Sequence, residues 1–159
     1  MAEDGDMTLP IALRVIRLSA IYDLVVTVGF AFAITATMLL DSLAALHDNL
    51  GLTGATPDPS DPFTIMFANL MGSVVTAWAV FRILRPSLLA GAVDIGARML
   101  FSIGMTVALF EGASPLVIVM LGLEIVWAAA QSIAIVAASR AGASRQTSTV
   151  DDPAIAAAF

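Results

Sequence analysis

The segment that decides the fold runs from Ser87 to Phe110, SLLAGAVDIGARMLFSIGMTVALF, an apolar stretch that carries only two charged residues. A helix needs about 20 apolar residues to cross roughly 30 Å of hydrocarbon, so this stretch predicts a membrane-spanning helix. The two charges, Asp94 and Arg98, stand four residues apart near its middle. A guanidinium at the centre of a membrane helix costs about 2.5–3.5 kcal/mol on insertion scales. Other groups must compensate for that charge, and such groups often mark the working part of a membrane protein.

The composition of the whole chain agrees with a membrane protein. Of its 159 residues, 59% are hydrophobic and only 13% are charged, whereas a soluble domain carries about 25% charged residues. There is no Lys, and no basic patch of the kind that binds nucleic acid. Cysteine is also absent, which excludes disulfides, thiolate metal sites, iron–sulfur clusters and a cysteine nucleophile.

Three further segments are long and apolar enough to span a membrane, which makes four in all. They run from Arg14 to Leu40, from Phe63 to Leu84 and from Pro115 to Ser139. The connections that follow the second and third spans are very short, so neighbouring helices should pack antiparallel. We therefore expect an all-α, polytopic membrane protein, with residues 1–140 forming an antiparallel bundle of four transmembrane helices.

Two segments lie outside the predicted spans. The loop over residues 41–61 contains LAALHDNLG, which either extends the first helix or lies along the membrane interface, followed by the turn-forming TGATPDPSDP. Residues 141–159 are polar and then rich in alanine, and we expect them to form a mobile cytoplasmic tail.

The placement of arginine predicts the orientation. Six of the seven arginines fall at one side of the four predicted spans, and the connections at the other side contain no Lys or Arg. Because positive charge favours the cytoplasmic side, both termini should be cytoplasmic. This pattern is typical of a multi-pass protein of a bacterial inner membrane. The six arginines are Arg14, Arg17, Arg82, Arg85, Arg140 and Arg145.

Polar residues of the four spans fall at one depth, between the cytoplasmic third of the membrane and its midplane, when counted at 1.5 Å per residue. On each span they recur three, four or seven residues apart, so each helix has one polar face. We expect all four faces to turn inward around a polar pocket. The faces consist of Ser19, Tyr22, Asp23 and Thr27; Asn69, Ser73 and Thr76; Gly91, Asp94, Arg98 and Met105; and Met120, Glu124, Trp127 and Gln131.

The charges in this layer do not balance. Asp23, Asp94 and Glu124 meet one buried arginine, Arg98, unless Arg82 also reaches inward. At least one acid should then keep its proton at neutral pH, because burial without a partner disfavours the carboxylate. Glu124 is our candidate, since it lies deepest and has no arginine within its own span. A neutral buried acid beside a fixed cation can act as a general acid or carry a proton.

The same residues also have a purely structural interpretation. Asp94 and Arg98 can form an intrahelical ion pair that lets the helix insert, and Glu124 can lock two helices by a hydrogen bond to Asn69. Asn69, Ser73, Thr76 and Gln131 can all serve as interhelical hydrogen bonds. His47, the only histidine, is expected to be a solvated loop residue. No cluster supplies three metal ligands, and no cofactor is expected.

The whole-chain pattern resembles small bacterial four-helix membrane proteins of the DoxX-like kind. With acids, an Asn and a Trp around a mid-membrane pocket, the chain also resembles EXPERA-type proteins, which include sterol isomerases and relatives of membrane terpene cyclases. The matching residues are Asp23, Asn69, Glu124 and Trp127. This resemblance implies a pocket for a lipophilic molecule, although the histidine of the sterol-isomerase pocket has no counterpart in these spans.

Three functions are compatible with the sequence. The first is a pocket that binds a lipophilic small molecule and isomerises or cyclises it by acid–base chemistry. Glu124 would donate the proton, Asp23 would accept one or steady a developing cation, and Asp94 with Arg98 would fix the local field. The ligand-binding residues would be Tyr22, Asn69, Ser73, Thr76, Trp127 and Gln131.

The other two functions involve a partner rather than a reaction. One is a non-catalytic membrane subunit or assembly factor, in which the polar layer holds the helices together and the lipid-facing surface meets a membrane partner protein. The other is a proton-linked transporter, which would need a homodimer because four helices make a thin conduit. The lipid bilayer is a partner in every case.

Overall fold

The computed structural model describes the backbone of residues 4–150 and the side chains of residues 8–144. All regular secondary structure in that range is helical, which confirms the predicted all-α class. The elements are α1 (Asp4–Thr27), the short 3-10 helix η1 (Val28–Ala31), α2 (Ala33–Asn49), α3 (Pro62–Leu84), α4 (Leu88–Phe110) and α5 (Leu116–Val150).

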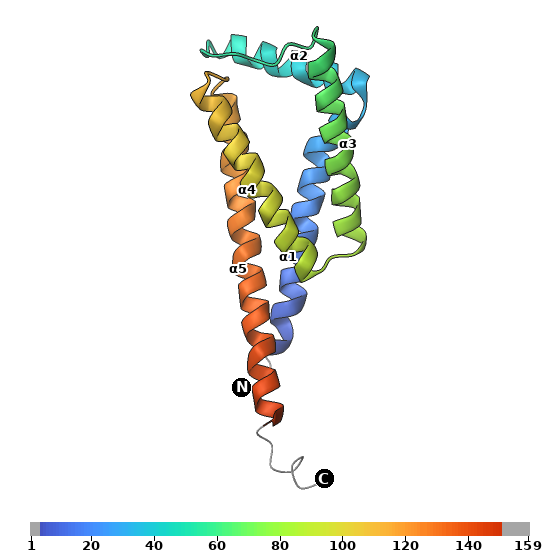
Figure 1. Cartoon of the computed structure of the whole chain (residues 1–159), viewed down its shortest axis with the longest axis vertical. Helices are drawn as coiled ribbons and strands as arrows, with labels where there is room; N and C mark the ends of the chain where they lie inside the picture. The colour runs from blue at the N-terminus through green and yellow to red at the C-terminus, as the bar shows by residue number, and fades with distance from the viewer. Residues whose placement is uncertain (1–3, 151–159) are drawn as a thin grey trace.

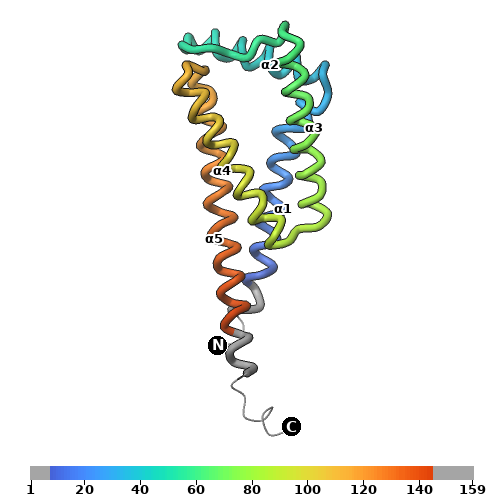
Figure 2. Tube along the Cα trace, in the orientation of Figure 1, coloured from blue at the N-terminus to red at the C-terminus, as the bar shows by residue number. Residues whose placement is uncertain are grey.

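Four of the helices run along the long axis of the molecule, and α2 lies across one end (Figure 1). α1 packs against both α3 and α5, and α4 packs against α5. α3 and α4 are consecutive, but their backbones have few close approaches; the trace in Figure 2 shows them meeting near their shared turn and separating toward α2. The expected packing of neighbouring helices therefore holds for α4 with α5 but not for α3 with α4.

The second, third and fourth predicted spans correspond to α3, α4 and α5. Among the described residues, three helical segments are long and apolar enough to cross a membrane, namely Pro62–Leu84, Leu88–Phe110 and Leu116–Ser144, and a bent pair of helices at the N-terminal side counts as a fourth if it forms one span. Their large apolar side chains face outward, as Phe110 at 86% exposure illustrates, and a hydrocarbon environment suits that surface. α5 continues to Val150, past the predicted end at Ser139. The mobility of residues 141–159 stays a prediction, and residues 151–159 lie outside the described residues.

The first predicted span is wrong as a single helix from Arg14 to Leu40. The chain bends by 105° between Thr8–Ala31 and Ala33–Asn49. Phe32 has an extended backbone, and the hydroxyl of Thr35 donates a hydrogen bond to its carbonyl oxygen at 3.1 Å. Residues 43–49 of the segment LAALHDNLG form the end of α2, and Leu50 and Gly51 follow it as a turn. Hydropathy did not reveal the bend because the apolar residues continue through it.

A close approach between α3 and η1 supports this bend. A Cβ atom placed on Gly72 would lie 2.5 Å from the carbonyl carbon of Phe30, so only glycine fits there without a shift of the backbone. Three residues earlier on α3, the side-chain amide of Asn69 donates to the carbonyl oxygen of Phe30 at 3.4 Å. α3 therefore holds the chain where it leaves α1.

The end of the molecule that carries α2 is tied together by hydrogen bonds between two loops. The amide of Ala55 donates to the carbonyl of Gly112, and the amide of Ser114 donates to the carbonyl of Ala55, both at 2.8 Å. His47 is only 6% exposed, and its Nδ1 lies 2.8 Å from the hydroxyl of Ser114. The prediction of a solvated histidine is wrong, because α2 folds back over the turn between α4 and α5.

Candidate functional site

Five charged side chains from all four long helices meet in the interior, and we call them the charged network. Ion pairs connect every member of the set. The members are Asp23 of α1, Arg82 of α3, Asp94 and Arg98 of α4, and Glu124 of α5. The predicted convergence of Asp23, Asp94, Arg98 and Glu124 at one level is confirmed.

Arg98 contacts all three acids. Its Nη2 lies 2.6 Å from Oδ2 of Asp23, its Nε lies 3.0 Å from Oδ2 of Asp94, and its Nη1 lies 2.7 Å from Oε2 of Glu124. Only 2% of the Arg98 side chain is exposed. Such a fork of donors suits several carboxylates at once, and it offsets the cost of burying the guanidinium.

Arg82 is the second cation of the network, and its role corrects the sequence-based count of one buried arginine. Its side chain is fully buried, pairs with Asp23, and places Nη1 2.7 Å from Oδ2 of Asp94. The carbon Cζ also lies 5.7 Å from the centre of the Trp78 ring, one turn earlier on α3. Glu124 in turn is paired with Arg98, so it is not an acid without a basic partner.

Neutral side chains complete the hydrogen bonding behind the charges. The hydroxyl of Ser19 accepts hydrogen bonds from Arg82, Arg98 and Gln131. Gln131 also donates to Oδ2 of Asp94 at 2.9 Å, and the indole N–H of Trp78 donates to Oδ1 of Asp94 at 3.0 Å. Sequence reasoning did not include Trp78 in the site and counted Arg82 among the arginines at the cytoplasmic side of the spans. Their spacing of four residues, which puts an indole and a guanidinium on one helix face, was the available signal for the network.

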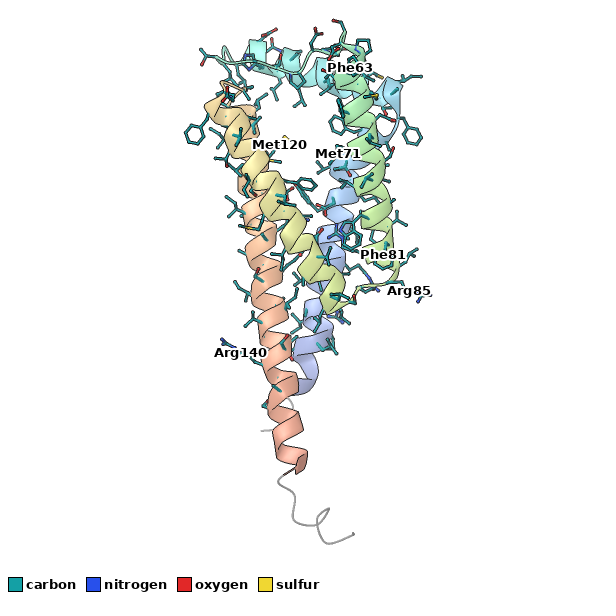
Figure 3. The ribbon with its side chains drawn as sticks, in the orientation of Figure 1. Phe63, Met71, Phe81, Arg85, Met120 and Arg140 are labelled. Atoms are coloured by element: carbon teal, nitrogen blue, oxygen red, sulfur yellow. The ribbon has the colours of Figure 1, made fainter. Side chains whose placement is uncertain are left out.

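A cavity of about 560 Å³ lies directly against the charged network. Apart from the network, its walls are almost entirely apolar. Met71 of α3 and Met120 of α5 line it from opposite sides (Figure 3). Val74 of α3 and Val93 of α4 also border it and are 56% and 53% exposed, so the cavity opens sideways between these two helices.

The acids of the network are more exposed than its arginines. The side-chain exposures are 0% for Arg82, 2% for Arg98, 4% for Asp94, 9% for Asp23 and 15% for Glu124. Glu124 is therefore the most exposed member of the charged network on the cavity wall. Tyr22 lines the same wall, and its ring packs on Trp127 at 5.6 Å between centres.

The predicted site residues divide into two groups. The cavity is lined by Tyr22, Asp23, Asp94, Arg98 and Glu124. Trp127 and Gln131 sit one layer behind it, against Tyr22 and Asp94 respectively.

Asn69, Ser73 and Thr76 do not line the cavity, which corrects their predicted place around the pocket. Nine residues separate Asn69 from Trp78, which at about 100° per residue places them on opposite sides of α3. Asn69 bonds to Phe30 and Ser73 is exposed, whereas the hydroxyl of Thr76 is buried without a hydrogen-bond partner in the described part of the chain. The helix turns its Trp78–Arg82 face inward instead, because Arg82 pairs with two acids there.

A second hollow of about 580 Å³ follows the groove between α4 and α5. None of the five charged residues lines it. The hydroxyls of Thr106 and Ser132 bond to carbonyls of their own helices, each at 2.7 Å. This groove therefore presents an apolar surface without charges, which makes it a suitable control for ligand binding in the cavity.

The fold and site together define an all-helical protein with three or four helices able to cross a membrane and an internal charged network beside an apolar cavity. Comparison with protein families, with curated proteins and with solved structures found no match to the chain. Among the described residues, no group of three or more His, Cys, Asp or Glu side chains is arranged to hold a metal ion.

Proposed function

We propose that this chain is a multi-pass membrane protein that binds a lipophilic small molecule in the cavity beside the charged network. The ligand would lie against Glu124 and Tyr22 and enter sideways from the bilayer, between α3 and α4. The bilayer and this ligand are its proposed partners.

The single observation that carries this proposal is that the ion pairs leave a void. A set of charges that served only to hold helices together would close with no space beside it. Here the ion pairs are closed, yet a cavity of about 560 Å³ remains against them. That volume lies within the roughly 300–1,000 Å³ of small-molecule pockets, which typically combine apolar walls with a few convergent polar groups.

Acid–base chemistry on the ligand, as in an isomerase or a cyclase, is the reaction that this wall would support. Glu124 is the most exposed acid and would exchange a proton with the ligand, with Asp23 as the second acid at the cavity. The fixed charges of Asp94 and Arg98 would set the electrostatic field at the position of the transferred proton.

The alternative is a non-catalytic membrane subunit or assembly factor. The observation in its favour is that the network joins α1, α3, α4 and α5 through closed ion pairs. In that case the exposed apolar surface would meet a membrane partner protein, and the cavity would hold lipid without specificity.

We further propose that four helices cross the membrane, with α1 and η1 as the first crossing and both termini in the cytoplasm. Arg14, Arg17, Arg85 and Arg140 are exposed. Arg85 and Arg140 lie away from α2 (Figure 3), and Arg17 donates a hydrogen bond to the carbonyl of Ile83, near the turn between α3 and α4, at 3.2 Å. The segments at the α2 end contain acids but no Lys or Arg. By the positive-inside rule, α2 would lie on the outer side. The charge pattern is that of a bacterial inner-membrane protein.

The experiment uses the two tryptophans of the chain. In a Trp127→Phe background, Trp78 on the cavity wall is the only indole. Bromododecane added to the protein in nanodiscs should quench its fluorescence in a saturable manner. Ala97→Phe, which fills the cavity, should abolish saturation, whereas Ala128→Phe, which fills the α4–α5 groove, should leave it unchanged.

A near-native circular dichroism spectrum and elution volume must accompany each variant. The three proteins compared are Trp127→Phe alone, with Ala97→Phe and with Ala128→Phe. Quenching that rises linearly with the bromododecane content, equally in all three, would show only that bromododecane partitions into the lipid. That outcome would overturn the proposed binding function.

A further inference from the structure

We infer that the ligand of this cavity is a lipophilic cation, bound in exchange for a proton. This inference rests on the proposed binding function and names the class of molecule that the site accepts. It comes from the charges of the network and from which of them face the cavity.

When all five groups are ionised, the charged network has one more negative than positive charge. Three carboxylates, those of Asp23, Asp94 and Glu124, meet two guanidiniums, those of Arg82 and Arg98. Both arginines are at most 2% exposed, and both are occupied by acids. An uncompensated charge in an apolar interior is costly, so the network favours one additional positive charge.

The excess charge is best placed at Glu124. Arg98 binds its Oε2, while its Oε1 accepts no hydrogen bond within the described part of the chain. The titratable and charged groups around it are Arg98 and Asp94 of α4 and Asp23 and Tyr22 of α1, with Arg82 of α3 behind the aspartates. The cavity therefore meets the network through carboxylates and a tyrosine ring.

The walls suit the apolar body of an organic cation. Phe101, Met105 and Met120 line the cavity around Glu124, and the ring of Tyr22 lies on the same wall. An aromatic ring attracts a cation through its face, and the methionines adapt to irregular shapes. An anion would meet no free guanidinium, and a neutral molecule would supply no positive charge to the network.

A proton is the natural competitor for this position. With the cavity free of a cation, one acid of the network carries the proton that balances the charge. Binding of an organic cation then releases that proton, so the cation should bind more tightly as pH rises. The three acids of the charged network together form the exchange site, and both arginines stay charged throughout.

Three probes of the same shape separate charge from size: the cation tetraphenylphosphonium, the neutral tetraphenylsilane and the anion tetraphenylborate. Binding of each is measured by equilibrium dialysis against the full chain in nanodiscs, with empty nanodiscs subtracted. We define binding at the cavity as the fraction of bound probe that is lost in Ala97→Phe and kept in Ala128→Phe. We expect tetraphenylphosphonium to bind the site at least about tenfold more tightly than tetraphenylsilane, and tetraphenylborate not to bind it.

Glu124→Gln removes the excess charge without changing the size of the side chain. Its affinity for tetraphenylphosphonium should fall at least about tenfold, by a larger factor than its affinity for tetraphenylsilane, and should become independent of pH. In the wild-type chain, tetraphenylphosphonium should bind more tightly as pH rises and release a proton, which a weakly buffered indicator dye detects. The pH series on the wild type keeps the test valid if Glu124→Gln does not fold.

The outcomes are distinct. Cavity-dependent binding of tetraphenylsilane that equals or exceeds that of tetraphenylphosphonium would overturn the cation inference and leave the proposed function standing. Tight phosphonium binding without pH dependence or proton release would overturn the exchange. No cavity-dependent binding of any probe, together with linear bromododecane quenching, would overturn the proposed function itself.

Discussion

Arg82 of α3 and Arg98 of α4 bind the same carboxylate oxygen, Oδ2 of Asp23 in α1. They also share one oxygen of Asp94, at 2.7 Å and 3.0 Å respectively. Two arginines and two aspartates thus form a closed ring. α3 and α4 have few other close contacts, so beside the cavity they are linked mainly by this ring and by the hydrogen bond from Trp78 to Asp94.

Removal of Arg82 should strongly destabilise the protein. In Arg82→Met, Asp23 and Asp94 lose a fully buried partner, and loss of one member of a buried ion pair typically costs about 3–5 kcal/mol. The free energy of unfolding is measured by SDS titration in mixed micelles. Arg85→Met, which removes an exposed arginine three residues later, is the matched control and should change it little. Equal effects of the two variants would contradict a structural role for the ring.

Gly72→Ala should disturb the bend between α1 and α2. The added Cβ would lie 2.5 Å from the backbone of Phe30, so the chain must shift, at a cost of about 1–3 kcal/mol. Gly104→Ala is the control, since a Cβ at Gly104 meets nothing within 4 Å and alanine is the better helix former by about 1 kcal/mol. The same SDS titration should show opposite signs for the two variants. A neutral Gly72→Ala would show that η1 does not need to lie so close to α3.

Asp61 should make stability sensitive to acid at the start of α3. It precedes Pro62–Leu84, the segment of α3 that is long and apolar enough to cross a membrane. Its pKa is held below the ordinary value of 3.8 because the side chain and amide of Thr64, and the amide of Phe63, donate hydrogen bonds to it. A depressed folded-state pKa gives stability that is present above pH 3.8 and lost as pH falls through the folded value. Asp61→Ala should therefore unfold at a lower temperature than wild type at pH 7, with the difference disappearing in acid.

Asp61→Asn is the control for this prediction. Asparagine can still accept the helix-capping hydrogen bonds, but it does not titrate. The melting temperature of the wild type should fall below pH 3.8 as Asp61 becomes protonated, and Asp61→Asn should lack this part of the fall. If Asp61→Asn and the wild type have the same pH profile, the acid sensitivity arises elsewhere in the chain.

Single cysteines should report the orientation, because the natural chain has none. Position 53, for Thr53→Cys, is in the loop that follows α2. Position 85, for Arg85→Cys, is between α3 and α4, away from α2 (Figure 3). In right-side-out vesicles, a membrane-impermeant maleimide should label the first directly and the second only after permeabilisation. The reverse pattern would contradict cytoplasmic termini.

Much of the site could be predicted from helical spacing. Asp94 with Arg98, and the depth of Asp23 and Glu124, pointed to one layer because charges in an apolar span must find partners. Arg82 was harder to assign, since an arginine near a helix end either extends to the interface or turns inward. The inward choice depends on Asp23 and Asp94 lying opposite, which is a property of packing. The same uncertainty led to the wrong face of α3 being assigned to the pocket.

The amino-acid sequence alone determined the helical class, three of the segments long and apolar enough to cross a membrane and the acids that meet Arg98, because hydrophobic length and residue spacing act within one segment. The tertiary structure decided the bend at Phe32, the inward position of Arg82 and the space between α3 and α4. These features depend on which helix faces approach each other. That choice is made by contacts between residues far apart in the chain, such as Gly72 with Phe30 and Arg82 with Asp23.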